Sequence, residues 1–166
     1  MPVLTTGRLM LREMTGADLD DMAALLGDEQ VMRYYPRPKT RDEARAWIEW
    51  NQRLYREHGF GLWAVLLRET GEFAGDCGLT PQHVDGADEV EVGYHIRARL
   101  QGNGYATEAA AAARDYARDV LSLHRLIAII NPANVPSQRV AAKIGLAPEK
   151  HATVFGGEHV IYAGRL

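Results

Sequence analysis

The stretch from Glu89 to Val120 reads EVEVGYHIRARLQGNGYATEAAAAARDYARDV. Its first residues alternate between apolar and polar or small side chains, which is the period of a strand with two different faces. Two closely spaced glycines, Gly102 and Gly104, then mark a turn with unusual backbone angles. From Tyr105 onward nearly every residue is a strong helix former. The stretch therefore predicts a strand, a glycine-bearing loop and a long helix.

The junction between this loop and the helix has the chemistry of an anion site. The first amides of a helix have no intrahelical acceptor, and the helix dipole adds partial positive charge there. Because the glycines carry no side chains, a phosphate could approach those amides closely. The same glycines also suit an ordinary strand-to-helix turn, in which they serve a steric need alone. Loop chemistry by itself leaves both interpretations open.

Three motifs in order along the chain resemble known signatures. Gln101-x-x-Gly104-x-Ala106 resembles the Gln/Arg-x-x-Gly-x-Gly/Ala signature with which the GNAT superfamily of N-acetyltransferases binds the pyrophosphate of acetyl-coenzyme A. The run from Gly102 to Ala109 and the segment from Thr6 to Arg12 resemble the RimJ/RimL-like branch, which contains ribosomal-protein N-terminal acetyltransferases. Asn134-x-x-Ser137, followed by Lys143-Ile144-Gly145-Leu146, resembles the second coenzyme motif of the family.

The resemblance implies an acetyl-CoA-dependent N-acetyltransferase in which a primary amine attacks the thioester directly in a ternary complex. The amine would belong to a protein N-terminus or to a small molecule. One departure from the branch concerns charge near the phosphates. Members often carry tryptophan before the first loop glycine and lysine between the two glycines, whereas this chain has Gln101 and Asn103 there. The backbone amides remain, but one positive charge is missing.

Length and composition restrict the classes of protein that fit. The chain has 166 residues, enough for one domain with a real core. Its 19 basic and 22 acidic residues give a net charge of −3, which does not favour binding to nucleic acid or to a membrane surface. A single cysteine, Cys77, excludes an internal disulfide. With no recognisable signal peptide or spanning segment, we expect a cytoplasmic protein.

Hydrophobic periodicity and capping signals predict the other elements. Thr15-x-x-Asp18 and Thr40-x-x-Glu43 each announce a helix. The expected strands are Val3 to Met14, Phe60 to Arg68, Glu72 to Leu79, Arg125 to Ile130, and a last hairpin of Ala147 to Val154 and His159 to Arg165. We expect a connector from Asp28 to Lys39, a loop from Pro81 to Asp88 and a helix from Pro136 to Lys143.

These elements predict an α/β (α+β) fold with helices covering a mixed sheet. The resemblance specifies the topology. It implies a GNAT-like, mostly antiparallel sheet of about seven strands with about four flanking helices. It also implies a V-shaped splay between the fourth strand, near residues 89–96, and the fifth, near residues 125–130. In the family the pantetheine arm of the coenzyme inserts into this splay and pairs with free backbone groups, as an added strand would.

The coenzyme site follows from the resemblance, residue by residue. The backbone of Tyr94 would polarise the thioester carbonyl, and Ser137 would protonate the departing thiolate because this helix lacks the tyrosine that many members use. An alternative remains open, in which Asn134 and Ser137 merely cap the helix. The implied coenzyme-binding residues are Tyr94, Ile96, Arg97, Gln101, Gly102, Asn103, Gly104, Tyr105, Ala106, Thr107, Asn134, Ser137 and Lys143.

Glu91 is the first candidate for the base that takes the proton of the acceptor amine. It lies on the central strand two residues before Gly93, where the branch often carries glutamate. An α-amine titrates near 7.7–8.0 and therefore needs only a modest base, reached directly or through water. Alternatively, Glu89 and Glu91 form a solvated strand face. Glu158 is a weaker candidate.

The acceptor pocket is expected to be lined by Tyr34, Tyr35, Trp63 and Tyr162, although each aromatic residue could equally belong to the core. The six histidines show no metal-binding spacing and suit surface or packing positions, so no metal is expected. A catalytically silent acyl-CoA sensor is the main alternative function, and an unrelated nucleotide-binding domain a weaker one. The acceptor amine and the oligomeric state are open; an edge strand or the last hairpin could support a homodimer.

Overall fold

The computed structural model describes residues 2–166, which form an eight-stranded sheet flanked by helices. The strand order is β1-β2-β3-β4-β5-β6-β8-β7, and every neighbouring pair is antiparallel except β5 and β6, which are parallel. The strands are β1 (Pro2–Thr5), β2 (Leu9–Arg12), β3 (Leu62–Leu67), β4 (Phe73–Val84), β5 (Ala87–Ile96), β6 (Arg125–Ile130), β7 (Ala147–Val154) and β8 (Gly157–Arg165). The α-helices are α1 (Leu19–Leu26), α2 (Arg41–His58), α3 (Tyr105–Asp119) and α4 (Val135–Lys143).

The predicted capping signals begin and end these helices as expected. Thr40 and Glu43 form a reciprocal capping box at the start of α2, and Gly59 ends that helix in the left-handed conformation. Thr15 and Asp18 form the same box ahead of a short 3₁₀ turn that leads into α1. Local sequence therefore sets the start of the segment that leads into α1 and both ends of α2.

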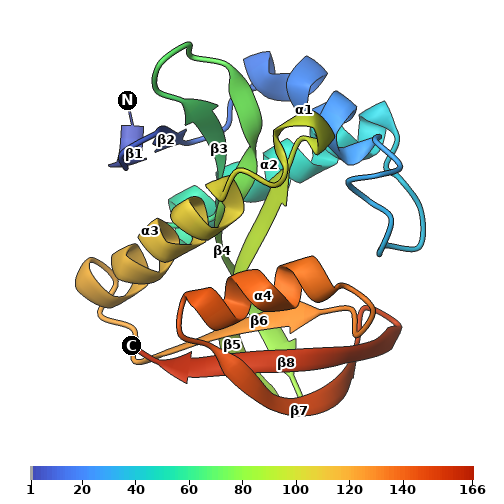
Figure 1. Ribbon diagram of the computed structural model, residues 1–166, viewed down its shortest axis with the longest axis vertical. Coiled ribbons are helices and arrows are strands. Elements are labelled where there is room, and N and C mark those ends of the chain that lie inside the picture. The colour runs from blue at the N-terminus through green and yellow to red at the C-terminus, as the bar shows by residue number, and fades with distance from the viewer. Residues whose placement is uncertain (1) are drawn as a thin grey trace.

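The two faces of the sheet carry different helices. Alternate residues of each strand face opposite sides, so Val92 of β5 packs with the alanines of α3 while Glu91 and His95 face the other side. On that other side α1 and α2 pack on Leu62 and Ala64 of β3. Figure 1 shows α3 and α4 crossing one side of the sheet, with β6 and β8 running across the lower half of the view.

The strand count and one loop differ from the sequence prediction. The sheet has eight strands rather than about seven, because the chain turns at Thr6–Arg8 and divides the first predicted strand into the β1–β2 hairpin. The predicted loop from Pro81 to Asp88 is wrong. Asp85 and Gly86, both with positive φ (49° and 80°), make a two-residue turn, so that β4 and β5 stay paired up to Val84 and Ala87.

The predicted splay lies between β5 and β6. Their register contains a single residue pair, Glu91 with Ile127, whereas β5 is paired with β4 along its whole length. Beyond Glu91 the two parallel strands diverge, which opens the sheet at its centre. Among residues 2–166 the helices are all too short or too polar to serve as a membrane span.

Candidate active site

Free backbone groups of β5 line one wall of the splay. The amide of Arg97 donates to Ala74 of β4 at 2.8 Å, so this residue directs its backbone away from the splay. Because successive residues of a strand direct their backbone groups to opposite sides, Tyr94 and Ile96 direct theirs towards β6. Beyond the Glu91–Ile127 pair, β6 offers them no partner in register. The backbone of Tyr94 and the amide of Ile96 thus have the expected geometry for pairing with an inserted chain, whereas the Arg97 amide does not. The carbonyl of Ile96 already accepts from Gln101 Nε2.

The loop between β5 and α3 has the exposed amides that an anion site requires. Gly102 and Gly104 both adopt a φ of +81°, and Gly104 forms the N-cap of α3 without a capping side chain. Within residues 2–166, the amides of residues 102–107 donate to no other part of the protein. A diphosphate placed here would meet unpaired donors at a helix N-terminus, so the residues present fit the coenzyme.

The side chains of the loop hold its shape. Gln101 donates through Nε2 to the carbonyl of Ile96 at 2.9 Å, and Asn103 donates through Nδ2 to that of Leu100 at 2.9 Å. Gln101 and Asn103 were both expected to bind the coenzyme. Their side chains are used within the loop, which leaves their backbone as the part that can meet a phosphate.

Arg8 holds the loop against the β1–β2 turn, a contact that was not expected from the sequence. Its guanidinium donates to the carbonyl of Asn103 at 2.9 Å and lies 4.4 Å from the centre of the Tyr105 ring. It also pairs with Glu108 at 2.7 Å, on the first turn of α3. The Thr6–Arg12 motif could have pointed to this residue, but only the fold brings the β1–β2 turn beside residues 103–108.

Two hydroxyl groups meet where α4 faces the splay. Ser137 donates through Oγ to Tyr94 Oη at 3.0 Å, and Tyr94 donates through Oη to the carbonyl of Ser137 at 2.8 Å. Burial raises the pKa of Tyr94, so its hydroxyl stays protonated. From sequence, Tyr94 was expected to act only through its backbone. Its side chain brings a tyrosine hydroxyl to a helix that has no tyrosine of its own.

Asn134 and Lys143 lie at the two ends of α4. Asn134 accepts the amide of Ser137 through Oδ1 at 3.1 Å and therefore caps the helix, which leaves its Nδ2 group for another partner. Lys143 is exposed in the last turn. The capping and coenzyme interpretations of Asn134 are thus compatible, because they use different atoms.

Glu91 lies at the point where β5 and β6 separate. Its Oε1 accepts from Thr80 Oγ1 and from Gln82 Nε2, both at 3.2 Å, and its Oε2 accepts the amide of Ile129 on β6 at 3.3 Å. Burial raises the pKa of Glu91 to about 7, and these hydrogen bonds only partly oppose that effect. A carboxyl group with this pKa can exchange a proton near neutral pH. Glu89, by contrast, forms an ion pair with Arg125 at 2.9 Å.

The connector carries Tyr34 and Tyr35 across the splay on the Glu91 side. Tyr35 Oη lies 2.7 Å from His95 Nε2 on β5, and the carbonyl of Tyr34 accepts from Asn131 Nδ2, just after β6, at 3.0 Å. We call residues 34–35 the strap, because they are bonded to both diverging strands. Tyr35 keeps 45% of its surface exposed, although burial around its hydroxyl group raises its pKa.

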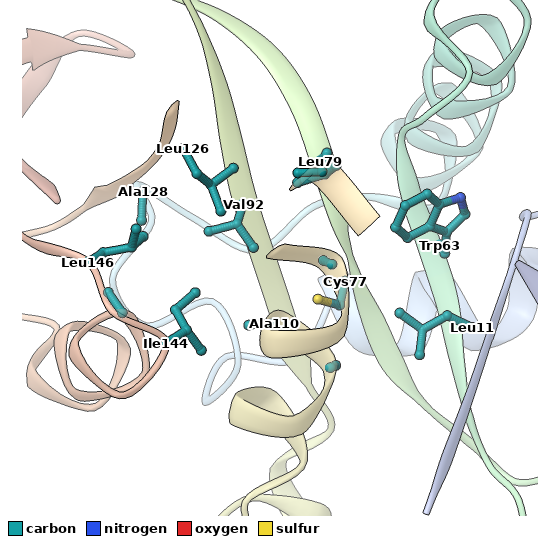
Figure 2. Close-up of a cluster of buried hydrophobic side chains, with 14 of the residues drawn as sticks. Leu11, Trp63, Cys77, Leu79, Val92, Ala110, Leu126, Ala128, Ile144 and Leu146 are labelled. Atoms are coloured by element: carbon teal, nitrogen blue, oxygen red, sulfur yellow. The ribbon is translucent and has the colours of Figure 1, made fainter. Parts of the chain in front are cut away.

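Trp63 and Tyr162 do not join this group. Trp63 is 1% exposed and stacks edge-on against Tyr116 of α3, with ring centres 5.1 Å apart, so it is a core residue (Figure 2). Tyr162 is buried in the same core cluster as the α3 alanines and donates through Oη to Gln138 of α4 at 3.0 Å. Glu158 is exposed at the start of β8, near His151. The structure gives none of the three a place beside Glu91.

A buried pair that was not expected from the sequence extends from Tyr35. His95 Nδ1 lies 2.7 Å from Asp76 Oδ1, and Trp47 of α2 donates through Nε1 to Asp76 Oδ2 at 3.1 Å. Asp76 and His95 are directly opposite in the β4–β5 register. Burial lowers the pKa of His95, but the charge and hydrogen bond of Asp76 outweigh it and leave the pKa raised.

Comparisons with known proteins agree with this geometry. Residues 8–147 match the family model described as an acetyltransferase (GNAT) domain. The uncharacterized protein YkkB of Bacillus subtilis (strain 168) is 41% identical over 144 residues, which are 86% of this chain and 84% of YkkB. The crystal structure of an acetyltransferase from Agrobacterium tumefaciens str. C58 has a TM-score of 0.88 at 27% identity and covers 100% of this chain and 95% of that one.

The ribosomal-protein acetyltransferases share the fold. RimL, an acetyltransferase of ribosomal L7/L12 whose structure is in complex with coenzyme A, superposes with a TM-score of 0.81. It is 16% identical, and the match covers 100% of this chain and 98% of RimL. At this identity the likeness concerns the arrangement of the elements.

Proposed function

Because this chain belongs to the GNAT family of acetyltransferases, we propose that it transfers the acetyl group of acetyl-CoA to a primary amine by direct attack. One observation carries the proposal. The splay between β5 and β6 has unpaired backbone groups at Tyr94 and a carboxyl group with a pKa of about 7 at Glu91. A thioester and an amine could therefore meet from the two faces of the sheet.

The coenzyme would be held mainly by backbone groups. The amides of residues 102–107 would receive the diphosphate, with Arg8 close by, and Tyr94 and Ile96 would pair with the pantetheine arm. The amide of Tyr94 is then placed to polarise the thioester carbonyl. Asn134 Nδ2 and Lys143 are the remaining groups that we assign to the coenzyme.

Proton transfer would involve a different group on each face. The amine nitrogen forms a bond to the carbonyl carbon, the carbon–sulfur bond breaks, and Glu91 receives the proton that the amine loses. The departing thiolate needs a proton. The Ser137 hydroxyl can donate its hydrogen, which otherwise points to Tyr94 Oη, and regain one from water. The balance closes because the amine gives up one proton and the thiol gains one.

We propose an α-amine as the first class of acceptor to test. The pKa of Glu91, about 7, is close to that of an α-amine, 7.7–8.0, so proton transfer between them is nearly balanced. A lysine side chain, with a pKa near 10.4, would be a much poorer match. The fold shared with RimL, named for a protein N-terminal amine, supports the same choice.

A coenzyme-release assay tests the proposal. Purified protein is given acetyl-CoA and either hexapeptides with free Ser or Ala N-termini or spermidine, and free thiol is measured; the same peptides with acetylated N-termini are the control. We expect thiol release only with free amines. Coenzyme binding without turnover on any amine would establish the silent-sensor alternative. If acetyl-CoA neither binds nor raises the melting temperature, the proposal is wrong.

A further inference from the structure

The buried pair of Asp76 and His95 has no role in the reaction described above, yet it is bonded to the strap. The chain of contacts runs from Trp47 Nε1 to Asp76, from Asp76 to His95, and from His95 Nε2 to Tyr35 Oη. Asp76 is 0% exposed, and 8% of the His95 side chain is exposed. A buried carboxyl group of this kind is costly unless it is fully hydrogen-bonded, and here both of its oxygens have partners.

Asp76 decides which nitrogen of His95 carries the proton. A carboxylate can only accept, so His95 donates through Nδ1–H and its Nε2 has no hydrogen when the ring is neutral. Tyr35 must then donate its hydroxyl hydrogen to Nε2. The hydroxyl oxygen is left with lone pairs only, because Tyr35 Oη has no second partner within residues 2–166.

The free lone pairs of Tyr35 lie within electrostatic reach of Glu91. Burial, and then the charges of Glu91 and Asp76, raise the pKa of Tyr35. Glu91 and His95 are four residues apart on one face of β5, about 13 Å between Cα atoms. The residue between them on that face is Gly93, which is half-buried and has no side chain. Leu62 of β3 borders this position, because its Cδ2 lies 3.3 Å from where a Cβ of Gly93 would be. The slot between the two acceptor groups thus has Gly93 as its floor and the Leu62 methyl group as one apolar wall.

We propose that Asp76 and His95 are positioning residues that turn the Tyr35 hydroxyl into a hydrogen-bond acceptor, so that Tyr35 and Glu91 together receive the N–H groups of the acceptor amine above Gly93. This inference rests on the proposed function and deepens it. It assigns primary amines, which present two or more N–H donors, as the class that this slot recognises.

The same contacts predict how the slot responds to acid. The charged groups that face His95 are Asp76 on β4, Glu91 on β5 and Lys39 in the connector, and Tyr35 is its other titratable neighbour. When His95 gains a proton, its Nε2–H donates to Tyr35 Oη. The Tyr35 hydroxyl hydrogen then points towards the slot, where it repels an N–H group of the amine. The pKa of His95 is raised, so this reversal begins at a higher pH than for an ordinary histidine.

The first test compares Tyr35→Phe and His95→Gln with His83→Gln. His83 forms a similar pair with Asp88, 3.0 Å apart, but on the exposed end of the β4–β5 hairpin, so it controls for the loss of a histidine–aspartate contact. With the amine that the release assay selects, we expect Tyr35→Phe to raise KM for the amine about three- to tenfold, the effect of one lost hydrogen bond, and to leave KM for acetyl-CoA unchanged.

The pH profile adds a readout that a merely structural role would not move. We expect kcat/KM of the wild type to fall below neutral pH more steeply than that of Tyr35→Phe, in which Glu91 and the amine itself still titrate but His95 no longer affects the slot. Tyr35→Phe keeps the exposed ring, so it remains informative if His95→Gln does not fold. The inference would be overturned if Tyr35→Phe turned over with the wild-type KM for the amine and the wild-type fall of kcat/KM at low pH. Absence of any turnover in the wild type would instead overturn the proposed function.

Nitrogen NMR of His95 tests the tautomer without any substrate. At pH 9 we expect the neutral ring to carry its proton on Nδ1, and we expect Asp76→Asn to lower the pKa of His95. A proton on Nε2 at that pH, or a His95 pKa that Asp76→Asn does not lower, would contradict the inference even if the enzyme is active.

Discussion

The two faces of the central strand β5 are built in different ways. On the α3 side the groups that would meet the coenzyme are mostly backbone amides, supplied by one continuous stretch, residues 94–107. On the α2 side the groups that would meet the amine are the side chains of Tyr35 and Glu91, which are far apart in the chain, and Tyr35 is positioned by His95 and Asp76. A site made of backbone groups can be recognised from a short sequence motif. A site made of side chains from several strands can be recognised only when the register of the sheet is known.

Glu91→Gln is expected to have the largest effect, because it removes the proton acceptor on the amine side. We expect kcat to fall about 10²- to 10³-fold, within the range of general base catalysis, with KM for acetyl-CoA unchanged. Glu91 acts as a base only when ionised, so wild-type kcat/KM should fall as the pH drops through about 7. In the variant, the part of this fall in kcat/KM that comes from protonation of Glu91 should be absent. Steady-state kinetics from pH 5.5 to 9 measures both effects.

Glu89→Gln is the matched control for this variant. Glu89 lies on the same strand and pairs with Arg125 at the exposed end of the sheet. It should retain wild-type kcat. Equal losses in the two variants would show that charge on the strand, rather than the position of Glu91, matters.

Gly102→Ala tests the backbone side, and Gly156→Ala controls for its strain. Both glycines have a left-handed φ (81° and 78°) and open space where the methyl group of alanine would lie, so each substitution should cost similar stability. Only Gly102 lies beside the predicted diphosphate. We expect its substitution to weaken acetyl-CoA binding about tenfold by titration calorimetry, as for one lost hydrogen bond to a charged group. Equal affinity in the two variants would place the coenzyme elsewhere.

Ser137→Ala and Tyr94→Phe test whether the paired hydroxyls act together on the leaving group. Because each can partly replace the other, we expect each single substitution to lower kcat about tenfold or less, below the usual effect of a general acid. The double variant should lose more than the product of the two single losses, since no hydroxyl of the pair is then left to replace the other. Fully multiplicative losses in the kinetic cycle would show that they act independently.

Asn134→Asp is expected to have the smallest effect and separates the two roles of that residue. A carboxylate keeps the acceptor that caps α4 but lacks the Nδ2 donor assigned to the coenzyme. We expect unchanged thermal stability and about a threefold weaker affinity for acetyl-CoA. Thr40→Ala, which removes the cap of α2, is the converse control, with lower stability and unchanged affinity. A fully retained affinity in Asn134→Asp would leave Asn134 with the capping role alone.

The coenzyme side could be predicted from sequence because its signals are local. Glycines at 102 and 104, a helix that begins at Tyr105 and a short strand from Arg125 to Ile130 were all expected and are all present. The side-chain bonds of Gln101 and Asn103 could not be predicted, since a motif gives the residue types but not the direction in which each side chain points.

Glu91 and Tyr35 were expected on the amine side, but the Asp76–His95 pair was missed for a reason that the turn at Asp85–Gly86 makes clear. Pro81 to Asp88 was expected to be a loop, so no register between β4 and β5 could be predicted. Asp-Gly between extended segments is a strong signal for a two-residue hairpin turn. Pairing the strands outward from that turn would have placed Asp76 opposite His95 and Thr80 opposite Glu91. A carboxyl partner for the histidine could then have been predicted from sequence.

The tightness of that turn has a consequence for how relatives of this protein can diverge. Side chains alternate along a strand, so adding or removing one residue at Asp85–Gly86 would slide one strand past the other and reverse which side chains share a face. Glu91 would lose Thr80, and His95 would lose Asp76. A remote, solvent-exposed bend that touches no substrate should therefore resist changes in length, and drift in amine preference should accumulate instead in the strap and in the end of β6.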